Sequence, residues 1–242
     1  MHKMIRITPA AVMSFVVMLV AAFAGTARAE TTVSTTADLT SNKTALQYVF
    51  SERAMLVMYQ LGVEKDKTFG LQQDCKTKYQ VRPVGAVLLK PVTFPDGGLN
   101  PKSGAWLTRY QLERCGDNKI YNAVFVADPN GGNPVPTPFY PGNPLGGPVL
   151  VHDAMMRAVT TALAKSGQSG CRKVDAFDMK VKQPPHDVID HGTTVKGVWK
   201  EVWTFRVCGQ MVDVDMDFIP DVGGGGTTIV TESVKATRGP AQ

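Results

Sequence analysis

Two histidines and two aspartates lie close together in the sequence, between His186 and His191. Imidazole nitrogens and carboxylate oxygens bind divalent transition metals, so His186, Asp190 and His191 are candidate ligands of a metal-dependent hydrolase. Their spacing does not match a zinc-protease motif, and the sequence identifies no further ligand. A polar surface loop is the favoured interpretation of this segment.

The other reactive arrangements are incomplete. Residues 167–171 read Gly-Gln-Ser-Gly-Cys, with cysteine where a Gly-x-Ser-x-Gly nucleophile motif has its last glycine. Asp213, Asp215 and Asp217 alternate along a predicted strand, but the glycine and glutamate that complete a calcium loop are missing. We therefore predict no catalytic residue and no cofactor, and we favour a protein that is not an enzyme.

A constant offset of 93 positions relates two parts of the chain. At this offset Trp106 matches Trp199, and a Cys-Gly pair follows each tryptophan at the same distance. The offset also matches aromatic, aliphatic and acidic residues: Tyr110 with Trp203, Leu112 with Phe205, Phe125 with Phe218, and Asp128 with Asp221. This ordered series predicts a tandem duplication, with repeat units at residues 41–128 and 148–234.

Each unit begins with an apolar stripe of helical spacing, at residues 42–61 and from Pro148 onward, and Gly62 and Gly167 are expected to end the helices. Strands are expected at residues 75–82, 86–94 and 106–115, and again at 171–182, 199–208 and 212–218. The predicted fold class is α+β: two tandem repeats, each with one amphipathic helix packed on a small, mostly antiparallel sheet and held by a disulfide.

The four cysteines are Cys75, Cys115, Cys171 and Cys208, and no Cys-x-x-Cys motif is present. An even number of cysteines in an exported protein predicts two disulfides. The first cysteine of each unit begins a predicted strand and the second ends one, which favours the pairs Cys75–Cys115 and Cys171–Cys208. The alternative pairs Cys75–Cys208 and Cys115–Cys171 also respect the duplication and stay open.

Seven prolines and five glycines occupy the stretch from Asp128 to Pro148. Such a composition does not form a regular helix or a central strand, so residues 129–147 are interpreted as a semi-rigid linker. The alternative is an exposed extended segment that a partner groove recognises. Its residues would be Pro136, Pro138, Phe139, Tyr140 and Pro141.

Four aromatic residues also have two interpretations. Trp106, Tyr110, Trp199 and Trp203 could line a ligand cleft between sheet and helix. Aromatic residues that share one side of a strand more often belong to the core, and we favour the core.

The first 29 residues read as a secretory signal peptide. A basic start precedes an apolar run, and Ala27-Arg28-Ala29 is the small-x-small pattern before a cleavage site. No cysteine lies near this site, so a lipoprotein is not expected. The mature protein is predicted to be soluble, periplasmic or secreted, without a membrane span, and to have flexible ends at residues 30–40 and 235–242.

Cleavage changes the charge of the chain. The full sequence carries a net charge of +5, and removal of Lys3, Arg6 and Arg28 leaves 23 basic against 21 acidic residues, or +2. A nucleic-acid partner would require a stronger basic footprint, so this class of partner is not expected.

These features favour a non-enzymatic binding or protein-interaction module of the bacterial envelope. Its partner would be another envelope protein or a small ligand, whose identity the sequence does not disclose. The alternatives are a metal-dependent hydrolase that uses His186, Asp190 and His191, and a small-ligand carrier with a cleft between the two repeats.

Overall fold

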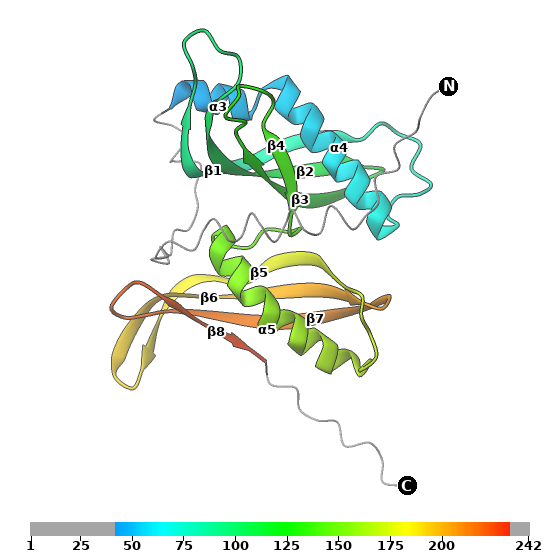
Figure 1. Cartoon of the computed structure of the whole chain (residues 1–242). Helices are drawn as coiled ribbons and strands as arrows, with labels where there is room; N and C mark the ends of the chain where they lie inside the picture. Colours follow the sequence, from blue (N-terminus) through cyan, green and yellow to red (C-terminus); the bar gives the residue numbers. More distant parts are fainter. Residues whose placement is uncertain (1–41, 233–242) are drawn as a thin grey trace.

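The structure, a computed structural model, describes residues 42–232. These residues form two four-stranded antiparallel sheets, three helices and two disulfides, so the fold belongs to the mixed α+β class that the sequence predicts. The first sheet and its helices lie above the second sheet and its helix in Figure 1. The expected signal peptide at residues 1–29 and the expected flexible ends at 30–40 and 235–242 lie outside the described residues.

The first sheet has the strand order β1-β2-β3-β4 and follows two helices. Its elements are α3 (Lys43–Val49), α4 (Glu52–Phe69), β1 (Gln80–Thr93), β2 (Ser103–Arg114), β3 (Asp117–Val126) and β4 (Val135–Phe139). The side chains of Asn42 and Ser51 accept backbone hydrogen bonds from the first turns of the two helices and cap them. Helix and strand residues share one core, in which Trp106 stacks on Phe125 with ring centroids 5.5 Å apart.

The second sheet has the strand order β5-β6-β7-β8 and follows one helix. Its elements are α5 (Pro148–Ser166), β5 (Val174–Asp190), β6 (Thr193–Val207), β7 (Gln210–Pro220) and β8 (Thr227–Thr231). Helix α5 begins with Pro148 and is ended by Gly167 in the left-handed conformation, as the sequence predicts. Its buried residues share a core with Trp199, which stacks on Phe218 with ring centroids 4.8 Å apart.

The prediction for the first helix is wrong in two respects. The helix is interrupted at Phe50 and Ser51, and α4 then continues through Gly62 to Phe69. Gly62 is buried against β2, where a Cβ atom would lie 3.1 Å from the Leu112 side chain and 3.4 Å from that of Tyr110. This glycine therefore allows the helix to approach the sheet closely and does not end it.

The segment expected to be a linker contributes a strand. Val135–Phe139 forms β4, which pairs with β3 at the edge of the first sheet. An edge strand tolerates proline because the missing backbone N–H can lie on the side that has no neighbouring strand. The prediction from the proline content was correct in that no central strand forms here. It missed that these residues form an edge strand.

Each half of the chain contains one disulfide, and neither bond joins the two halves. Cys75 is bonded to Cys115 and Cys171 to Cys208, the pairs favoured by the expected strand ends. Cys115 and Cys208 have positive φ angles of 44° and 46° at the turns that follow β2 and β6. Each disulfide thus ties a tight turn to the segment between a helix and the first strand of its sheet.

No helix within residues 42–232 is long and apolar enough to cross a membrane.

Loss of either disulfide is expected to destabilise the chain. The bonds span 40 and 37 residues, for which the chain-entropy relation gives about 4 kcal/mol each. The double variants Cys75→Ser/Cys115→Ser and Cys171→Ser/Cys208→Ser avoid a free partner thiol. Urea unfolding should show a decrease of this size in the free energy of unfolding for each, and alkylation of unreduced wild-type protein should detect no thiol. A wild-type chain that alkylates at two or more cysteines would contradict this assignment.

Candidate functional site

Residues 140–147, here called the connecting segment, run between the two sheets and bind both. The Gly142 N–H donates to the Ile120 carbonyl of β3 over 2.9 Å, and the Asn143 N–H donates to the Met179 carbonyl of β5 over 2.7 Å. The Asn122 side chain donates to the carbonyls of Tyr140 and Gly142. The connecting segment therefore joins an inner strand of the first sheet to the edge strand of the second.

Only glycine fits at the centre of this junction. Gly142 has a φ angle of +102°, and a Cβ atom there would overlap the backbone of Met179. A side chain would have to displace β5 from the connecting segment. The distance between the two sheets at this point is therefore set by a residue without a side chain.

A cavity of about 360 Å³ opens beside this junction. We call it the seam cavity. It is lined by the first half, the connecting segment and β5, through Leu71, Gln111, Arg114, Asp117, Asn118, Lys119, Ile120, Gly142, Asn143, Phe177, Asp178, Met179 and Lys180. Its volume lies within the range of small-molecule sites in proteins.

Lys119 is the unusual residue of the cavity wall. Only 8 % of its surface is exposed, and its ammonium lies 3.9 Å from the ring centroid of Phe177, across the seam. The rings of Phe69 and Tyr121 each lie 5.9 Å from the same nitrogen. Burial lowers the pKa of the Lys119 ammonium, and the charge of Asp178 partly opposes this effect.

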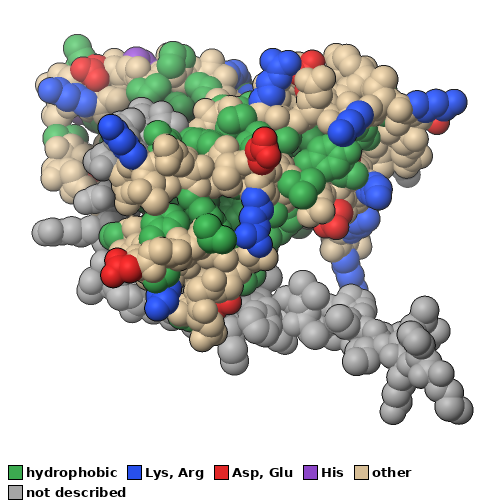
Figure 2. Space-filling view, turned by 90° about the horizontal axis from the view of Figure 1, so that it is seen from above, with side chains coloured by type: hydrophobic (Ala, Val, Ile, Leu, Met, Phe, Trp, Pro, Cys, Tyr) green, Lys and Arg blue, Asp and Glu red, His purple; other side chains and the backbone are tan. Residues whose placement is uncertain are grey.

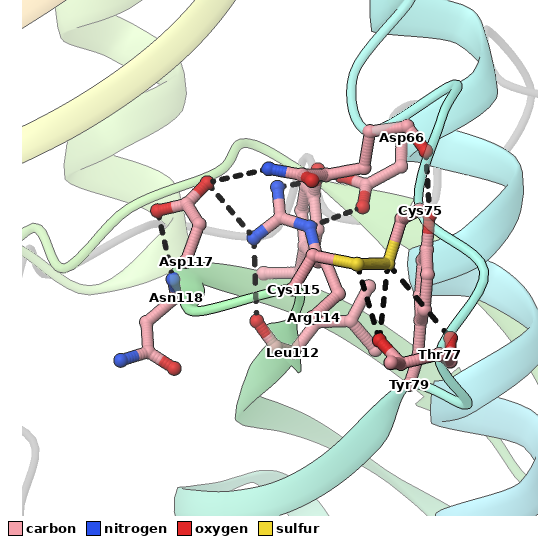
Figure 3. A network of polar contacts seen from close by, with 11 residues as sticks. Asp66, Cys75, Thr77, Tyr79, Leu112, Arg114, Cys115, Asp117 and Asn118 are labelled. Carbon is pink, nitrogen blue, oxygen red and sulfur yellow. Dashed lines mark hydrogen bonds and ion pairs between the residues drawn. A yellow bond between two sulfur atoms is a disulfide. The ribbon is translucent and has the colours of Figure 1, made fainter.

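The buried ion pair between Asp66 and Arg114 supports the same wall (Figure 3). The Arg114 guanidinium donates to both Asp66 oxygens, over 2.5 and 3.1 Å, and the Tyr121 hydroxyl also donates to Asp66. Burial raises the pKa of the Tyr121 hydroxyl well above its usual range, and this hydrogen bond raises it further. The opposite side of the guanidinium lies 3.5 Å from Asp117, a residue of the cavity wall. Arg114 thus connects the core to the cavity.

A second cavity of about 400 Å³ lies between the end of α4 and strands β5 and β6. Arg206 lines this cavity. Its guanidinium donates hydrogen bonds to the Phe69 carbonyl over 2.7 Å and to the Asp175 carboxylate over 3.0 Å, so it already has partners. The ring of Phe69 lies beneath it, with a ring centroid 5.1 Å from that of Phe177. This group of residues fastens the two halves together at the end of α4.

The structure does not bring the candidate metal ligands of the alternative interpretation together. His186 lies within β5, where its ring nitrogens contact Pro184 and Gln183, whereas His191 lies in the turn after the strand with 97 % of its side chain exposed. Five residues of extended strand span roughly 16 Å, too far for one metal ion. Among residues 42–232, the acidic side chain near His191 is that of Asp190, at 3.7 Å. Within residues 42–232 no three His, Cys, Asp or Glu residues are grouped so that they could hold a metal.

Most of the segment considered as an alternative recognition site is not freely exposed. Phe139 and Tyr140 pack against the core of the second sheet, with ring centroids 4.8 Å apart, and Pro141 is buried. Pro136 and Pro138 belong to β4 and pair with β3. Phe139 and Tyr140 thus attach the chain to the second core, whereas Pro138 stays exposed at the edge of the first sheet.

The candidate cleft aromatics are core residues. Trp106 and Tyr110 are 2 % exposed, and Trp199 and Trp203 are 3 % and 0 % exposed. The two tryptophans of β6 each donate an indole N–H to the carboxylate of Glu201, over 2.8 and 2.7 Å. None of the four lines the seam cavity.

Sequence analysis missed the buried charges. Burial raises the pKa of the Glu201 carboxyl, while the hydrogen bonds from Trp203, the Leu145 N–H and Trp199 lower it. A signal was present: Glu201 lies at the strand positions of the core tryptophans, and Lys119 shares those of Tyr121. A charged residue at a core position of a strand indicates a buried, partnered or functional charge.

The outer surface gives less indication of a binding site than the seam cavity does. In the view of Figure 2, the Lys and Arg side chains of the described residues are spread among acidic and apolar ones and form no single basic patch on that face.

Comparisons with protein-family models, curated proteins and solved structures found no match for this chain. Its function must therefore be inferred from the site itself.

Gly142→Ala is expected to cost about 3 kcal/mol or more, because the new methyl group strains a positive φ angle and collides with the β5 backbone. Gly131→Ala is the matched control: its φ angle is +78°, and no atom lies within 4 Å of the added Cβ, so only about 1–2 kcal/mol is expected. Urea unfolding measures both, and hydrogen exchange of the Asn143 amide should accelerate only in Gly142→Ala. Equal effects of the two variants would show that the junction is not close-packed.

Arg114→Met is expected to cost about 3–5 kcal/mol, because it leaves the buried Asp66 carboxylate without its guanidinium. The double variant Asp66→Leu/Arg114→Met removes both charges and should recover a large part of that loss in urea unfolding. If the double variant is as unstable as the single variant, the loss of stability comes from the packing of the two side chains and not from the unpaired charge.

Proposed function

We propose that this chain is an exported, non-enzymatic binding module of the bacterial envelope, which holds a small ligand in the seam cavity between two repeated units. The observation that carries the proposal is the composition of the cavity wall, which comes from the first half, the connecting segment and β5. Residues from two folded parts that line one cavity are typical of ligand sites between domains.

The duplication is part of the proposal, and several equivalent features support it. Both sheets have four antiparallel strands in sequential order. Trp106 and Trp199, 93 positions apart, each stack on a phenylalanine, at interplanar angles of 2° and 4°. Cys115 and Cys208, also 93 positions apart, have the same left-handed backbone conformation and each close a disulfide with the segment before the first strand.

The two disulfides also support export, because such bonds persist in oxidising compartments such as the periplasm. The signal peptide at residues 1–29 remains a prediction from the sequence, and Glu30 would be the mature N-terminus.

The state of the reactive groups supports binding over catalysis. All four thiols are in disulfides. The buried carboxylates of Asp66 and Glu201 accept hydrogen bonds from Arg114, Tyr121 and the two tryptophans of β6, and neither residue lines the seam cavity. These acids stabilise the two cores and are not placed to act on a bound molecule.

Native mass spectrometry of the mature protein, gently purified from the periplasm, tests the proposal. A bound small molecule is expected in wild type and lost in Gln111→Trp, which fills the seam cavity with an indole. Gln183→Trp, on β5 outside the cavity lining, should retain the ligand. Protein without ligand after purification from its own host, or a ligand that survives Gln111→Trp, would refute binding in the seam cavity.

A further inference from the structure

Lys119 has an incompletely satisfied charge. The residue is 8 % exposed and its ammonium still reaches the space of the seam cavity, and no carboxylate of residues 42–232 lies within ion-pair distance of this ammonium. No hydrogen-bond acceptor among the described residues receives its three N–H donors either; its close neighbours are the rings of Phe177, Phe69 and Tyr121. Aromatic rings attract a cation, but they replace only part of the hydration that the ammonium has lost.

The acids of the seam cavity are already occupied. Asp117 lies 3.5 Å from Arg114, and Asp178 lies 3.2 Å from Lys180. The lining therefore carries three cations and two carboxylates, and each carboxylate has a cation of its own. Lys119 is the lining cation that has no carboxylate of residues 42–232 within ion-pair distance, although the charge of Asp178 acts on it from further away.

The cavity wall around Lys119 has both apolar and polar side chains. Leu71, Ile120, Phe177 and Met179 line the same space, together with the amides of Gln111, Asn118 and Asn143. Inorganic phosphate would use only the polar donors of this wall and would leave its apolar side chains uncovered. A monoanion with an apolar body would use both the ammonium and the apolar wall.

We infer that the seam cavity binds a small organic carboxylate with an apolar or aromatic body, and that its carboxylate pairs with the Lys119 ammonium. This inference rests on the proposed function, since it specifies the ligand of the same cavity. A bound carboxylate would supply the missing anion and hydrogen-bond acceptors, and it would stabilise the charged form of a lysine whose pKa burial lowers.

The test compares 3-phenylpropionate with its amide, which has nearly the same shape and no charge, and with inorganic phosphate. Calorimetry on the mature, disulfide-bonded wild type should show binding of the acid, with the amide at least about tenfold weaker. Acid and amide of equal affinity, tighter binding of phosphate, or no binding of the acid would each overturn the inference. The comparison uses the wild-type chain, so no variant has to fold.

Three variants then assign the effect to one side chain. Lys119→Met should weaken acid binding about tenfold and leave the weak amide binding unchanged, whereas Lys119→Arg should retain a preference for the acid. Lys182→Met is the control, because it removes an exposed lysine paired with Asp215, away from the cavity. If Lys119→Met changes only the melting temperature, the lysine is a structural cation–π contact and the inference is wrong.

The outcomes separate this inference from the proposed function. A ligand that is retained from the periplasm and lost in Gln111→Trp, but that is neutral, would preserve the seam cavity as the binding site and refute the role of Lys119. A cavity without any ligand in both experiments would refute both.

Discussion

The contact of the connecting segment with both sheets determines how the rest of the protein is arranged. Gly142 and Asn143 donate backbone hydrogen bonds to β3 and β5, and both residues line the seam cavity. The same segment serves the buried charges: Leu145 donates its N–H to Glu201, and the guanidinium of Arg109 donates to Asn143 and to the Pro144 carbonyl. The buried carboxylate of the second half therefore depends on a segment held by the first half, which couples the two cores.

This coupling follows from the cost of burying polar groups without partners. A fully buried carboxylate is tolerated only when its lone pairs receive donors. Glu201 obtains two donors from Trp199 and Trp203 within β6 and the third from the connecting segment. A displacement of this segment would expose the second core and remove a donor from Glu201, so its position is well determined despite its high proline and glycine content.

The sequence was most informative where one physical signal acted alone. Glycine and proline marked the ends of α5, and strand positions indicated the disulfide pairs. Prediction failed where two signals competed: Gly62 resembled a helix stop because its packing partner, Leu112, is 50 positions away in sequence. The alternative metal site depended on a loop that brings His186 and His191 together, whereas β5 extends beyond its two prolines and keeps them apart, which local composition does not indicate. The sequence places Lys119 at a core position of β3, which is an unusual place for a lysine. The aromatic rings around its ammonium belong to three different elements, and only the fold brings them together.

The proposed duplication makes the differences between the halves meaningful. At the offset of 93, Arg114 and Lys119 of the first half correspond to Val207 and Val212, which are buried apolar residues of the second core. Glu201 corresponds to Thr108, whose buried hydroxyl has no hydrogen-bond partner among the described residues. Buried ion pairs add little net stability, so stability alone does not account for the charges of Arg114 and Lys119 at positions that are apolar in the other half. Arg114 and Lys119 lie at the end of the first half and line the seam cavity, while the equivalent valines belong to the core of the second half and line neither of the two cavities described above. Two core positions of the first half are thus charged where they line the seam cavity, in agreement with the ligand site proposed there.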